Sequence, residues 1–310
     1  MDRKVYDIVG KRKIYFTISF VFLIVTILYC LIFGVEVDVD FKGGAMVSYS
    51  IDKEVNLEEV EQKIGEVVGT NVTATVGETI GGSGQTLVIT FADEADQDMV
   101  VKIEDSLKND LGIENANLLD NNSVSATAGM KFFLKSLVAV AFAFIVLVLY
   151  IAWRFKKISG WSAGIVAIVA LLHDVLVVFA AFAFFRLPLD DNFIAVVLTI
   201  LGYSINNTII IYDRIRENRD LYGKKKSNVE LVNLSISQTL GRSFNTSLCT
   251  LIAMIVVVIV ALAMNVSSII SFAFPLAVGI AVGFYTSVCF AGSLWIWWQE
   301  KKSSKTTKSA

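Results

Sequence analysis

Two ionisable residues, His173 and Asp174, lie side by side in the middle of a long apolar stretch, residues 161–185. An aspartate at the centre of a membrane span costs roughly 2.5–3.5 kcal/mol on insertion scales, so such residues are rare and usually serve a function. We interpret the pair as a protonatable site on an ion path. The alternative is a hydrogen-bonded pair that fixes neighbouring helices together, and we favour the first interpretation.

Polar side chains also recur on the two apolar stretches that follow, residues 192–212 and residues 244–264. Their spacing is that of one helical face, and such a face has to point toward protein or water because lipid offers no hydrogen bonds. Amide and hydroxyl groups also hold membrane helices together, so the spacing fits an ion path and interhelical contact equally well. The candidates are Thr199, Tyr203, Ser204, Asn206, Asn207 and Asp213 around the first stretch, and Arg242, Ser243, Thr246, Ser247 and Thr250 around the second.

The sequence lacks the motifs of soluble enzymes. It has no phosphate-binding glycine loop, no dinucleotide fingerprint and a single histidine, which excludes a His-based metal cluster. Its three cysteines, Cys30, Cys249 and Cys289, all fall in apolar stretches and offer no disulfide framework. We therefore expect no catalytic residue, no metal and no cofactor, and we predict that the protein is not an enzyme.

The composition of the chain predicts that the polar candidate residues lie on membrane-spanning helices. The chain is 55% hydrophobic and contains only two prolines. Windows of about 20 apolar residues are long enough to cross a bilayer. Six such spans are expected, near residues 14–34, 132–153, 161–185, 192–212, 244–264 and 269–290, with the last one continuing to residue 298.

The distribution of charge predicts the orientation of these spans. Residues 1–13 carry five basic residues and the connection 213–242 carries seven, whereas residues 35–130 have five lysines against nineteen acidic residues. The positive-inside rule then places the N-terminus, the 213–242 loop and the tail 299–310 in the cytoplasm, and residues 35–130 outside it. An acidic block of this kind is not suited to nucleic acid.

The outer block, residues 35–130, has the pattern of a small α+β domain. Apolar residues alternate in residues 45–51, 72–76 and 87–91, which predicts three strands. Apolar residues at helical spacing follow the first and the third of these strands, which predicts two helices. Residues 114–126 are a weaker candidate for a fourth strand. The order βαββαβ is that of a ferredoxin-like domain. Turns are expected at Gly81–Gly84 and, on residue type, at Gly43 and Gly44.

The 213–242 connection contains an amphipathic pattern. Val229, Val232, Ile236 and Leu240 fall on one face of a helix, so we expect a separate cytoplasmic helix that lies on the membrane surface or on a partner. The basic tract Lys224–Lys226 is interpreted as an orientation signal that faces lipid.

Several motifs in this order resemble the SecD/SecF family of protein-export membrane proteins, which belongs to the resistance-nodulation-division superfamily. The resemblance runs over nearly the whole chain and is closest to the SecF members. Asp40, Phe41, Gly43 and Gly44 are similar to the D-F-x-G-G motif that follows the first span. Residues 172–175 resemble the third-span H-D motif, residues 198–208 and 212–218 resemble G-Y-S-x-N-D-[ST] followed by D-R-I-R-E-N, and residues 238–247 extend the similarity.

This resemblance implies an auxiliary subunit of the Sec translocase that promotes ion-gradient-driven export of polypeptides through the SecYEG channel. The implied partners are SecD, SecYEG, YajC, the translocating polypeptide and the lipid bilayer, without nucleic acid. The implied location is the bacterial inner membrane, with both termini in the cytoplasm. A transmembrane H⁺ or Na⁺ gradient would take the place of a cofactor.

One position departs from the family pattern. The proton-coupled members carry a titratable Asp where this chain has Asn207, near an Arg that corresponds to Arg242. An amide cannot load or release a proton. Coupling is therefore expected to pass through Asp174, through SecD, or through Na⁺, for which the side-chain carbonyls of Asn206 and Asn207 are suitable hard oxygens. Without its counter-ion, Arg242 is expected near Asp213 or a lipid phosphate.

Two other functional classes compete with this interpretation. A small-molecule exporter of the same superfamily would also use a polar intramembrane face, but an outer domain of this size has little room for a substrate pocket. An intramembrane aspartyl protease would need two facing carboxylates, whereas Asp174 is the only one predicted at the middle of a span.

Overall fold

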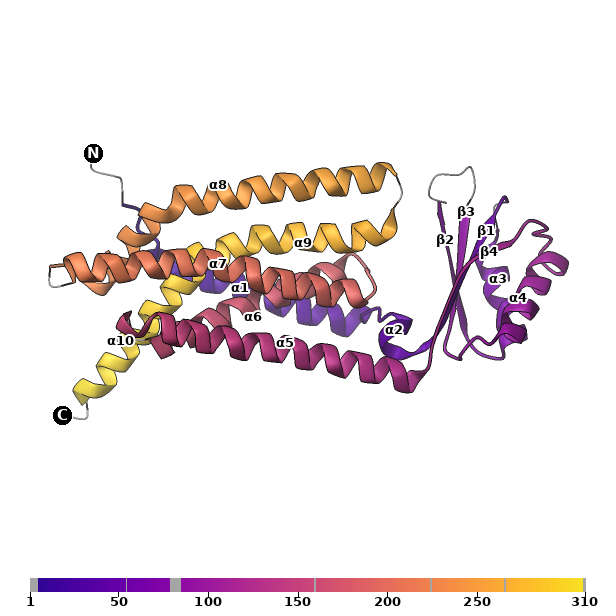
Figure 1. The fold of residues 1–310 in the computed structure, drawn as a ribbon, viewed down its shortest axis with the longest axis horizontal. Coiled ribbons are helices and arrows are strands. Elements are labelled where there is room, and N and C mark those ends of the chain that lie inside the picture. The colour runs from indigo at the N-terminus through magenta and orange to yellow at the C-terminus, as the bar shows by residue number, and fades with distance from the viewer. Residues whose placement is uncertain are drawn as a thin grey trace.

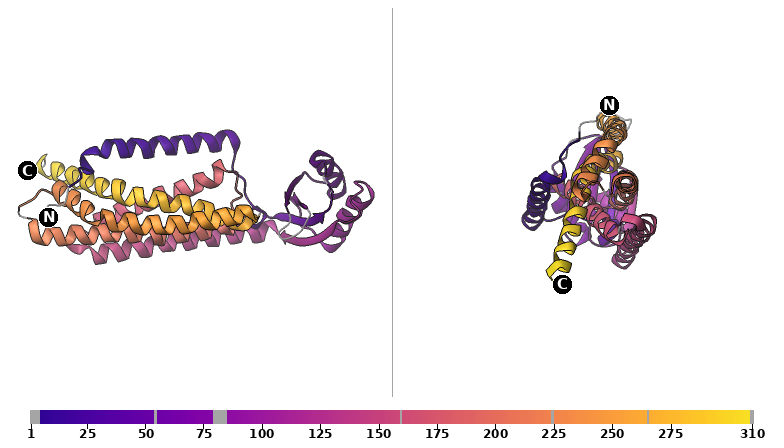
Figure 2. Two further views of the ribbon diagram at one scale, coloured as in Figure 1. Left: turned by 90° about the horizontal axis from the view of Figure 1, so that it is seen from above. Right: turned by 90° about the vertical axis from the view of Figure 1, so that its left-hand side faces the viewer.

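The structure, a computed structural model, describes residues 5–53, 55–78, 85–158, 160–223, 225–264 and 266–308. It consists of an elongated helical bundle with a small sheet-containing domain beyond one end, and the two chain ends lie at the opposite end of the bundle (Figure 1). The two views of Figure 2 show the first long helix along the outside of the bundle.

Within the described residues, six helices are long and apolar enough to cross a membrane, which confirms the predicted number of spans. The last span is not one regular helix, because a π-helical segment interrupts it. The spans are α1 (Arg12–Phe33), α5 (Ala126–Arg154), α6 (Gly160–Phe184), α7 (Asp191–Tyr222), α8 (Asn228–Ala263) and a composite of α9 (Ser267–Tyr285), the π segment η3 (Thr286–Ala291) and α10 (Gly292–Lys308).

Three of the six spans form the centre of the bundle. The apolar windows of α6, α7 and the last span are 61%, 56% and 50% buried, whereas those of α1, α5 and α8 are 11%, 6% and 11% buried. Small residues permit the close approach of the central helices. At Gly279 on α9, for example, a Cβ atom would lie 2.6 Å from Ile200 Cδ1 on α7. The polar residues of α6 and α7 are thus held where lipid does not reach them.

The connection between the fourth and fifth spans differs from the prediction. No separate surface helix is seen in its described part, because α7 and α8 both continue past the predicted span ends to Tyr222 and from Asn228. Ser227 begins α8 with a capping box to Glu230. Val232 and Ile236 are fully buried in the core of the bundle, so the amphipathic face packs on the chain's own helices. Lys224 lies outside the described residues.

The outer domain has the predicted order βαββαβ. Its antiparallel sheet has the strand order β2-β3-β1-β4, which is the ferredoxin-like arrangement. The alternating residues of β1 account for this fold, since Ala45, Val47, Tyr49 and Ile51 are all buried. The predicted turn Gly81–Gly84 lies outside the described residues. The elements are β1 (Gly44–Ile51), α3 (Leu57–Val68), β2 (Val72–Glu78), β3 (Gln85–Phe91), α4 (Gln97–Asn109) and β4 (Asn117–Val124).

The chain enters this domain through a short helix, α2 (Val39–Lys42), and leaves it where β4 ends at Val124. Ser125 then caps α5, because its hydroxyl accepts a hydrogen bond from the Ala128 amide at 3.3 Å. Two adjacent chain segments therefore connect the outer domain to the bundle.

Candidate functional site

Asp174 on α6 lies at the centre of the bundle and is fully buried. Its Oδ2 atom accepts a hydrogen bond of 2.5 Å from the Ser204 hydroxyl on α7. Its Oδ1 atom lies 3.6 Å from Nδ1 of His173 and has no hydrogen-bond partner among the described residues. One carboxylate oxygen thus binds a neighbouring helix while the other keeps its capacity for a proton or a cation.

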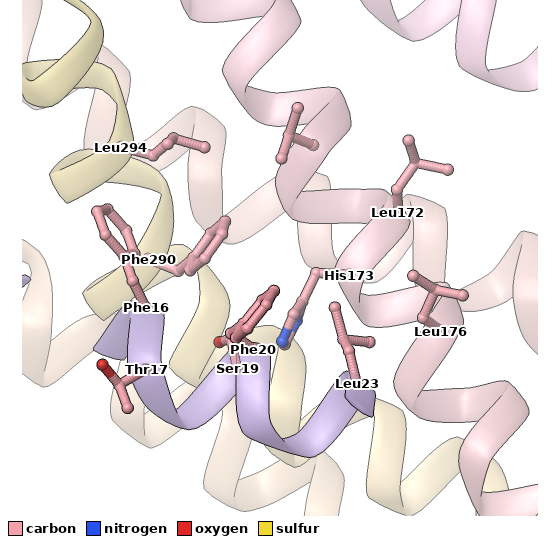
Figure 3. Close-up of a pocket in the computed structure, with 11 residues that line it drawn as sticks. Phe16, Thr17, Ser19, Phe20, Leu23, Leu172, His173, Leu176, Phe290 and Leu294 are labelled. Carbon is pink, nitrogen blue, oxygen red and sulfur yellow. The ribbon is translucent and has the colours of Figure 1, made fainter. Parts of the chain in front are cut away.

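His173 is held by the last span. The Thr286 hydroxyl lies 3.3 Å from its Nδ1 atom, and the Phe290 ring stacks on the imidazole at a centroid distance of 5.4 Å. Figure 3 shows the imidazole pointing from α6 toward α1, where Ser19 and Phe20 face it. It lines an apolar hollow of about 570 Å³ between α1, α6 and the last span. The His-Asp pair of α6 therefore contacts both other central spans, α7 through Asp174 and the last span through His173.

A layer of hydroxyl groups continues the site from α7 to the last span. The Ser287 hydroxyl donates to the Ser204 carbonyl at 3.2 Å and lies 3.0 Å from the Thr208 hydroxyl. Because the π segment changes the helical repeat, it lets the consecutive residues Thr286 and Ser287 both turn inward, and π segments often occur at functional sites. The sequence interpretation missed this pair. The one signal was two adjacent hydroxyl residues within the last apolar stretch.

Within the membrane-spanning part of the bundle, the polar faces of α7 and α8 meet at Asn207 and Ser247. Asn207 donates from Nδ2 to the Ser247 hydroxyl at 3.4 Å, while its Oδ1 atom is buried without a partner in the described structure. The buried Ser243 hydroxyl is likewise unpaired. It differs from Thr246 and Thr250 on the same helix, whose hydroxyls bond to backbone carbonyls one turn earlier. A buried polar atom without a partner costs about 1–3 kcal/mol, which makes these atoms candidates for binding an ion or water.

The predicted stripe on α7 does not stay together in the structure. Ser204, Asn207 and Thr208 are buried in the bundle, whereas Thr199 and Asn206 are on its outer surface. Tyr203 lies between these two faces, and its hydroxyl is buried without a partner among the described residues. The structure therefore brings Asp174 together with the inward face, and it leaves Thr199 and Asn206 exposed at the middle of a span.

Asp213 and Arg242 lie at the end of the bundle opposite the outer domain. Both line one hollow of about 420 Å³ between α7 and α8. Asp213 forms ion pairs with Arg154 at 3.0 Å and with Arg216 at 2.9 Å. Arg242 is exposed and forms no ion pair within the described part of the chain. Arg242 thus lies near Asp213 as expected, but other arginines neutralise that carboxylate.

The glycine pair that links α2 to β1 is a point of close approach and not the plain turn expected from residue type. Gly43 and Gly44 have φ values of +81° and +120°. A Cβ atom on Gly43 would lie 2.3 Å from Ala126 Cα, and one on Gly44 would lie 2.4 Å from the Phe91 carbonyl oxygen. Only glycine fits at both positions, because the start of α5 and the end of β3 occupy the space of a side chain.

Asp40 and Phe41, which precede the glycine pair, connect the outer domain to the bundle. Phe41 is buried, and its ring lies 5.7 Å from that of Phe132 and 5.3 Å from that of Phe133 on α5. Asp40 accepts a hydrogen bond of 3.0 Å from the Asn122 amide on β4. We call the segment 40–44, with its contacts on α5 and β4, the outer joint.

Two carboxyl groups lie beside the outer joint. The Asp38 amide donates to the Leu189 carbonyl at 3.1 Å, which ties the segment after α1 to the connection between α6 and α7. Burial raises the pKa of Asp38 above its usual value; the hydrogen bond from the Asp40 amide lowers it in part, and the nearby charges of Asp40 and Asp190 raise it further. Burial also raises the pKa of Asp190, whose carboxylate caps α7 by accepting from the Phe193 amide at 3.1 Å.

Comparison with known proteins gives a consistent result. A family model described as protein export membrane protein SecD/SecF, C-terminal, matches residues 102–301. The chain is 32% identical to the protein translocase subunit SecF of Sebaldella termitidis, over 95% of this chain and 91% of that protein. It is also 32% identical to the protein translocase subunit SecDF of Bacillus subtilis, over 97% of this chain but only 39% of that protein.

Solved structures agree with these sequence matches. The crystal structure of SecDF from a Thermus species, described as a translocon-associated membrane protein, superposes with a TM-score of 0.80 at 27% identity, covering 96% of this chain and 39% of that chain. A second structure, SecDF in a super-membrane-facing form, superposes with a TM-score of 0.64 at 25% identity and covers 99% of this chain and 40% of that one.

Proposed function

Because this chain belongs to the SecD/SecF family of protein-export membrane proteins, we propose that it is a SecF-type translocase subunit that couples an ion gradient to polypeptide export. One observation carries the coupling role. The carboxylate of Asp174 is fully buried between the central spans, with one oxygen bonded to α7 and the other without a partner among the described residues. A buried ionisable residue at this depth is costly and typically functional.

The geometry supports a simple coupling step. A proton or a cation at the free oxygen of Asp174 neutralises the carboxylate that accepts the Ser204 hydrogen bond. The strength of this hydrogen bond between α6 and α7 then changes. An ion that crosses the membrane supplies about 2.3 kcal/mol per charge per 100 mV. That free energy is enough to shift a balance between two arrangements of packed helices. Either H⁺ or Na⁺ can serve in this proposal, since the free oxygen of Asp174 can take up a proton, and the free oxygens of Asp174 and Asn207 are both suitable hard ligands for Na⁺.

SecD is the first partner in this proposal. The chain corresponds to only 39% of SecDF, so a SecDF protein holds a further portion that this chain does not match. The exposed polar face of α7 and α8 supports a partner of that kind, because polar groups at mid-span rarely face lipid. Its members are Thr199, Asn206 and Thr246. SecYEG, YajC and the translocating polypeptide are further partners, the last of which would meet the outer domain.

We place the protein in the bacterial inner membrane with both termini in the cytoplasm. The positive-inside rule supports this orientation, because the basic connections lie at the end of the bundle opposite the acidic outer domain. We also propose a non-catalytic role. Asp174 is the one carboxylate fully buried in a span of the described chain, whereas aspartyl proteolysis needs a pair.

An export assay in inverted membrane vesicles tests the coupling role. The H⁺ and Na⁺ gradients are collapsed separately, and Asp174→Asn is compared with the native chain and with Asp191→Asn, a control at the exposed start of α7. We expect Asp174→Asn to reduce export to the rate seen without the coupling gradient, and the control to keep the stimulated rate. If Asp174→Asn retains gradient-stimulated export, the chain is a passive scaffold for SecD and the proposal is wrong.

A further inference from the structure

A hollow of about 570 Å³ lies between α1, α6 and the last span (Figure 3). Apart from His173, the described residues that line it are apolar or carry a single hydroxyl group, and none of them is an acid, a lysine or an arginine. Hollows of this size with mostly apolar walls and few polar groups are typical of sites for small molecules. The proposed coupling step uses Asp174 and Ser204, which do not line this space. The hollow is therefore a candidate binding site of its own.

Fixed contacts hold α1 beside the hollow. The Tyr285 hydroxyl on the last span donates to the Tyr15 carbonyl at 3.0 Å and lies 3.4 Å from the Ser19 hydroxyl. Farther along α1, the Tyr29 ring meets the Phe184 ring of α6 edge-on at a centroid distance of 4.8 Å. α1 is thus anchored to two spans, although only 11% of its apolar window is buried. The hollow is the space that these contacts leave between α1 and α6, so it belongs to the folded bundle.

His173 is the strongly buried ionisable residue in the described lining of the hollow, with 6% of its surface exposed. Its ring points from α6 into the hollow (Figure 3). Its Nδ1 atom lies 3.3 Å from the Thr286 hydroxyl, which has no other hydrogen-bond partner among the described residues. We assign that hydroxyl as the donor, so the neutral ring carries its proton on Nε2. Nε2 forms no hydrogen bond within the described part of the chain, and an unpaired donor in an apolar hollow is costly.

Aromatic rings form the wall beside this nitrogen. The Phe290 ring stacks on the imidazole at a centroid distance of 5.4 Å, and the Phe16 ring meets Phe290 edge-on at 5.3 Å. Such rings favour stacked or edge-on contact with another flat ring. A plain acyl chain would fill the space but leave Nε2 unpaired. A buried water needs about two to four polar partners, which the rings of Phe16, Phe20 and Phe290 do not provide. The wall and the nitrogen together suit a flat ring that carries an oxygen acceptor.

We propose that the hollow binds a lipid-soluble molecule whose flat ring carries a carbonyl oxygen. That oxygen would accept a hydrogen bond from His173 Nε2, and the ring would pack on the aromatic wall. An apolar tail would leave the hollow past Leu172 and Leu176, which are 44% and 43% exposed. His173 lies at the middle of α6, whereas the ester and phosphate oxygens of phospholipids lie at the boundaries of the bilayer. The ligand therefore carries its ring into the apolar interior, and its binding does not depend on ion coupling.

Native mass spectrometry of the full chain in detergent tests this proposal with two probes that share a decyl tail. Decylubiquinone has a flat ring with carbonyl oxygens, and decylbenzene has a flat ring without them. We expect one saturable decylubiquinone per chain. Its affinity should exceed that of decylbenzene about tenfold, because only the quinone pairs the buried donor. Equal affinity for the two probes, or no saturable binding of decylubiquinone, would overturn the proposal.

Two tryptophan variants of α1 test the place of binding. Leu23→Trp enlarges a side chain that lines the hollow, so it should remove the decylubiquinone complex. Leu28→Trp makes the same change on α1 outside the hollow, where Leu28 is 52% exposed, and it should keep the native affinity. Circular dichroism checks that both variants retain the native helix content. Equal losses in the two variants would place the probe elsewhere and contradict the proposal.

His173→Phe tests the hydrogen bond. The variant keeps a flat ring beside Phe290 and removes the nitrogen donor, so it should bind decylubiquinone and decylbenzene with equal affinity. A variant that still prefers the quinone about tenfold would show that another group recognises the oxygen, and the assignment to His173 would be wrong. If His173→Phe does not fold, the comparison of Leu23→Trp with Leu28→Trp decides whether the hollow is the site.

Discussion

At the scale of single residues, Asp174 and Asn207 are the two buried side chains on which the proposed ion coupling depends. Asp174 retains a carboxylate with one unpaired oxygen, and Asn207 offers a buried carbonyl oxygen that is also unpaired within the described chain. Asn207 lies one turn from Ser204 on α7, and Ser204 binds Asp174 directly. The two side chains therefore belong to one polar layer, although only Asp174 can carry a proton.

This arrangement predicts a rescue at Asn207. Asp174→Asn should lose gradient-stimulated export, and adding Asn207→Asp should restore part of it, because a carboxylate then returns to the same layer and the Ser247 hydroxyl can donate to it. The control is Asn206→Asp, an identical change on the exposed face of α7. Export by the double variants is measured in the vesicle assay with the gradient on and off. Equal rescue from both positions, or none from Asn207→Asp, would contradict the shared layer.

At the scale of secondary structure elements, the outer joint decides how the outer domain is attached. α2, β1 and α5 meet at Gly43, and the Phe41 ring is buried against α5. Close backbone contact of this kind transmits displacement, since packed atoms cannot move independently. Movement of α5 should therefore reach the outer domain through the outer joint.

Gly43→Ala should break this joint. Gly43 has φ +81° and ψ 169°, a conformation that is essentially restricted to glycine and costs roughly 1–3 kcal/mol for other residues, and the clash with Ala126 adds about 1–3 kcal/mol of overpacking. We expect faster limited proteolysis between α1 and β1 and a lower thermal unfolding temperature. Gly77→Ala on β2 is the matched control, because no atom lies within 4 Å of its Cβ position. Similar protease sensitivity in both variants would argue against close packing at Gly43.

At the scale of the whole molecule, the described residues form two separate hydrophobic cores. One fills the bundle and the other lies between the sheet and the helices α3 and α4, and the two share no residue. Tyr49 is fully buried in the second core, where its hydroxyl donates to the Val100 carbonyl at 3.3 Å. The outer domain therefore has the packing that an independently folding unit requires.

The isolated fragment 35–130 should unfold cooperatively, and its stability should fall at alkaline pH. Burial, and secondarily the charge of Glu104, raises the pKa of the Tyr49 hydroxyl in the folded domain. The folded state thus keeps this proton at a pH where the unfolded chain, with a pKa of about 10, releases it. Stability is then lost as the pH rises above about 10. Urea unfolding followed by circular dichroism between pH 7 and 11 measures this slope, and Tyr49→Phe should make it shallower. An unchanged slope in that variant would assign the effect to other groups.

Local patterns in the sequence were enough to predict the six spans and the βαββαβ order, and to place His173 and Asp174 within the third span. Each depends on a short-range rule: the length of an apolar run, the alternation of a strand, or the cost of a charge in lipid. Such rules give the face of an element but not the element that packs against it. Asn206 and Asn207 are adjacent in sequence, yet one is exposed and the other buried.

Only the tertiary structure decided which polar residues meet. It turned Thr286 and Ser287 inward through a π segment, paired Asp213 with Arg154 of another span, and placed Gly43 directly against α5. The amphipathic stretch after residue 227 packs in the core of the bundle and not on the membrane surface, which the sequence pattern alone did not show. The physical reason is that a partner is chosen by close packing between helices far apart in the sequence, and no periodicity within one helix records that choice.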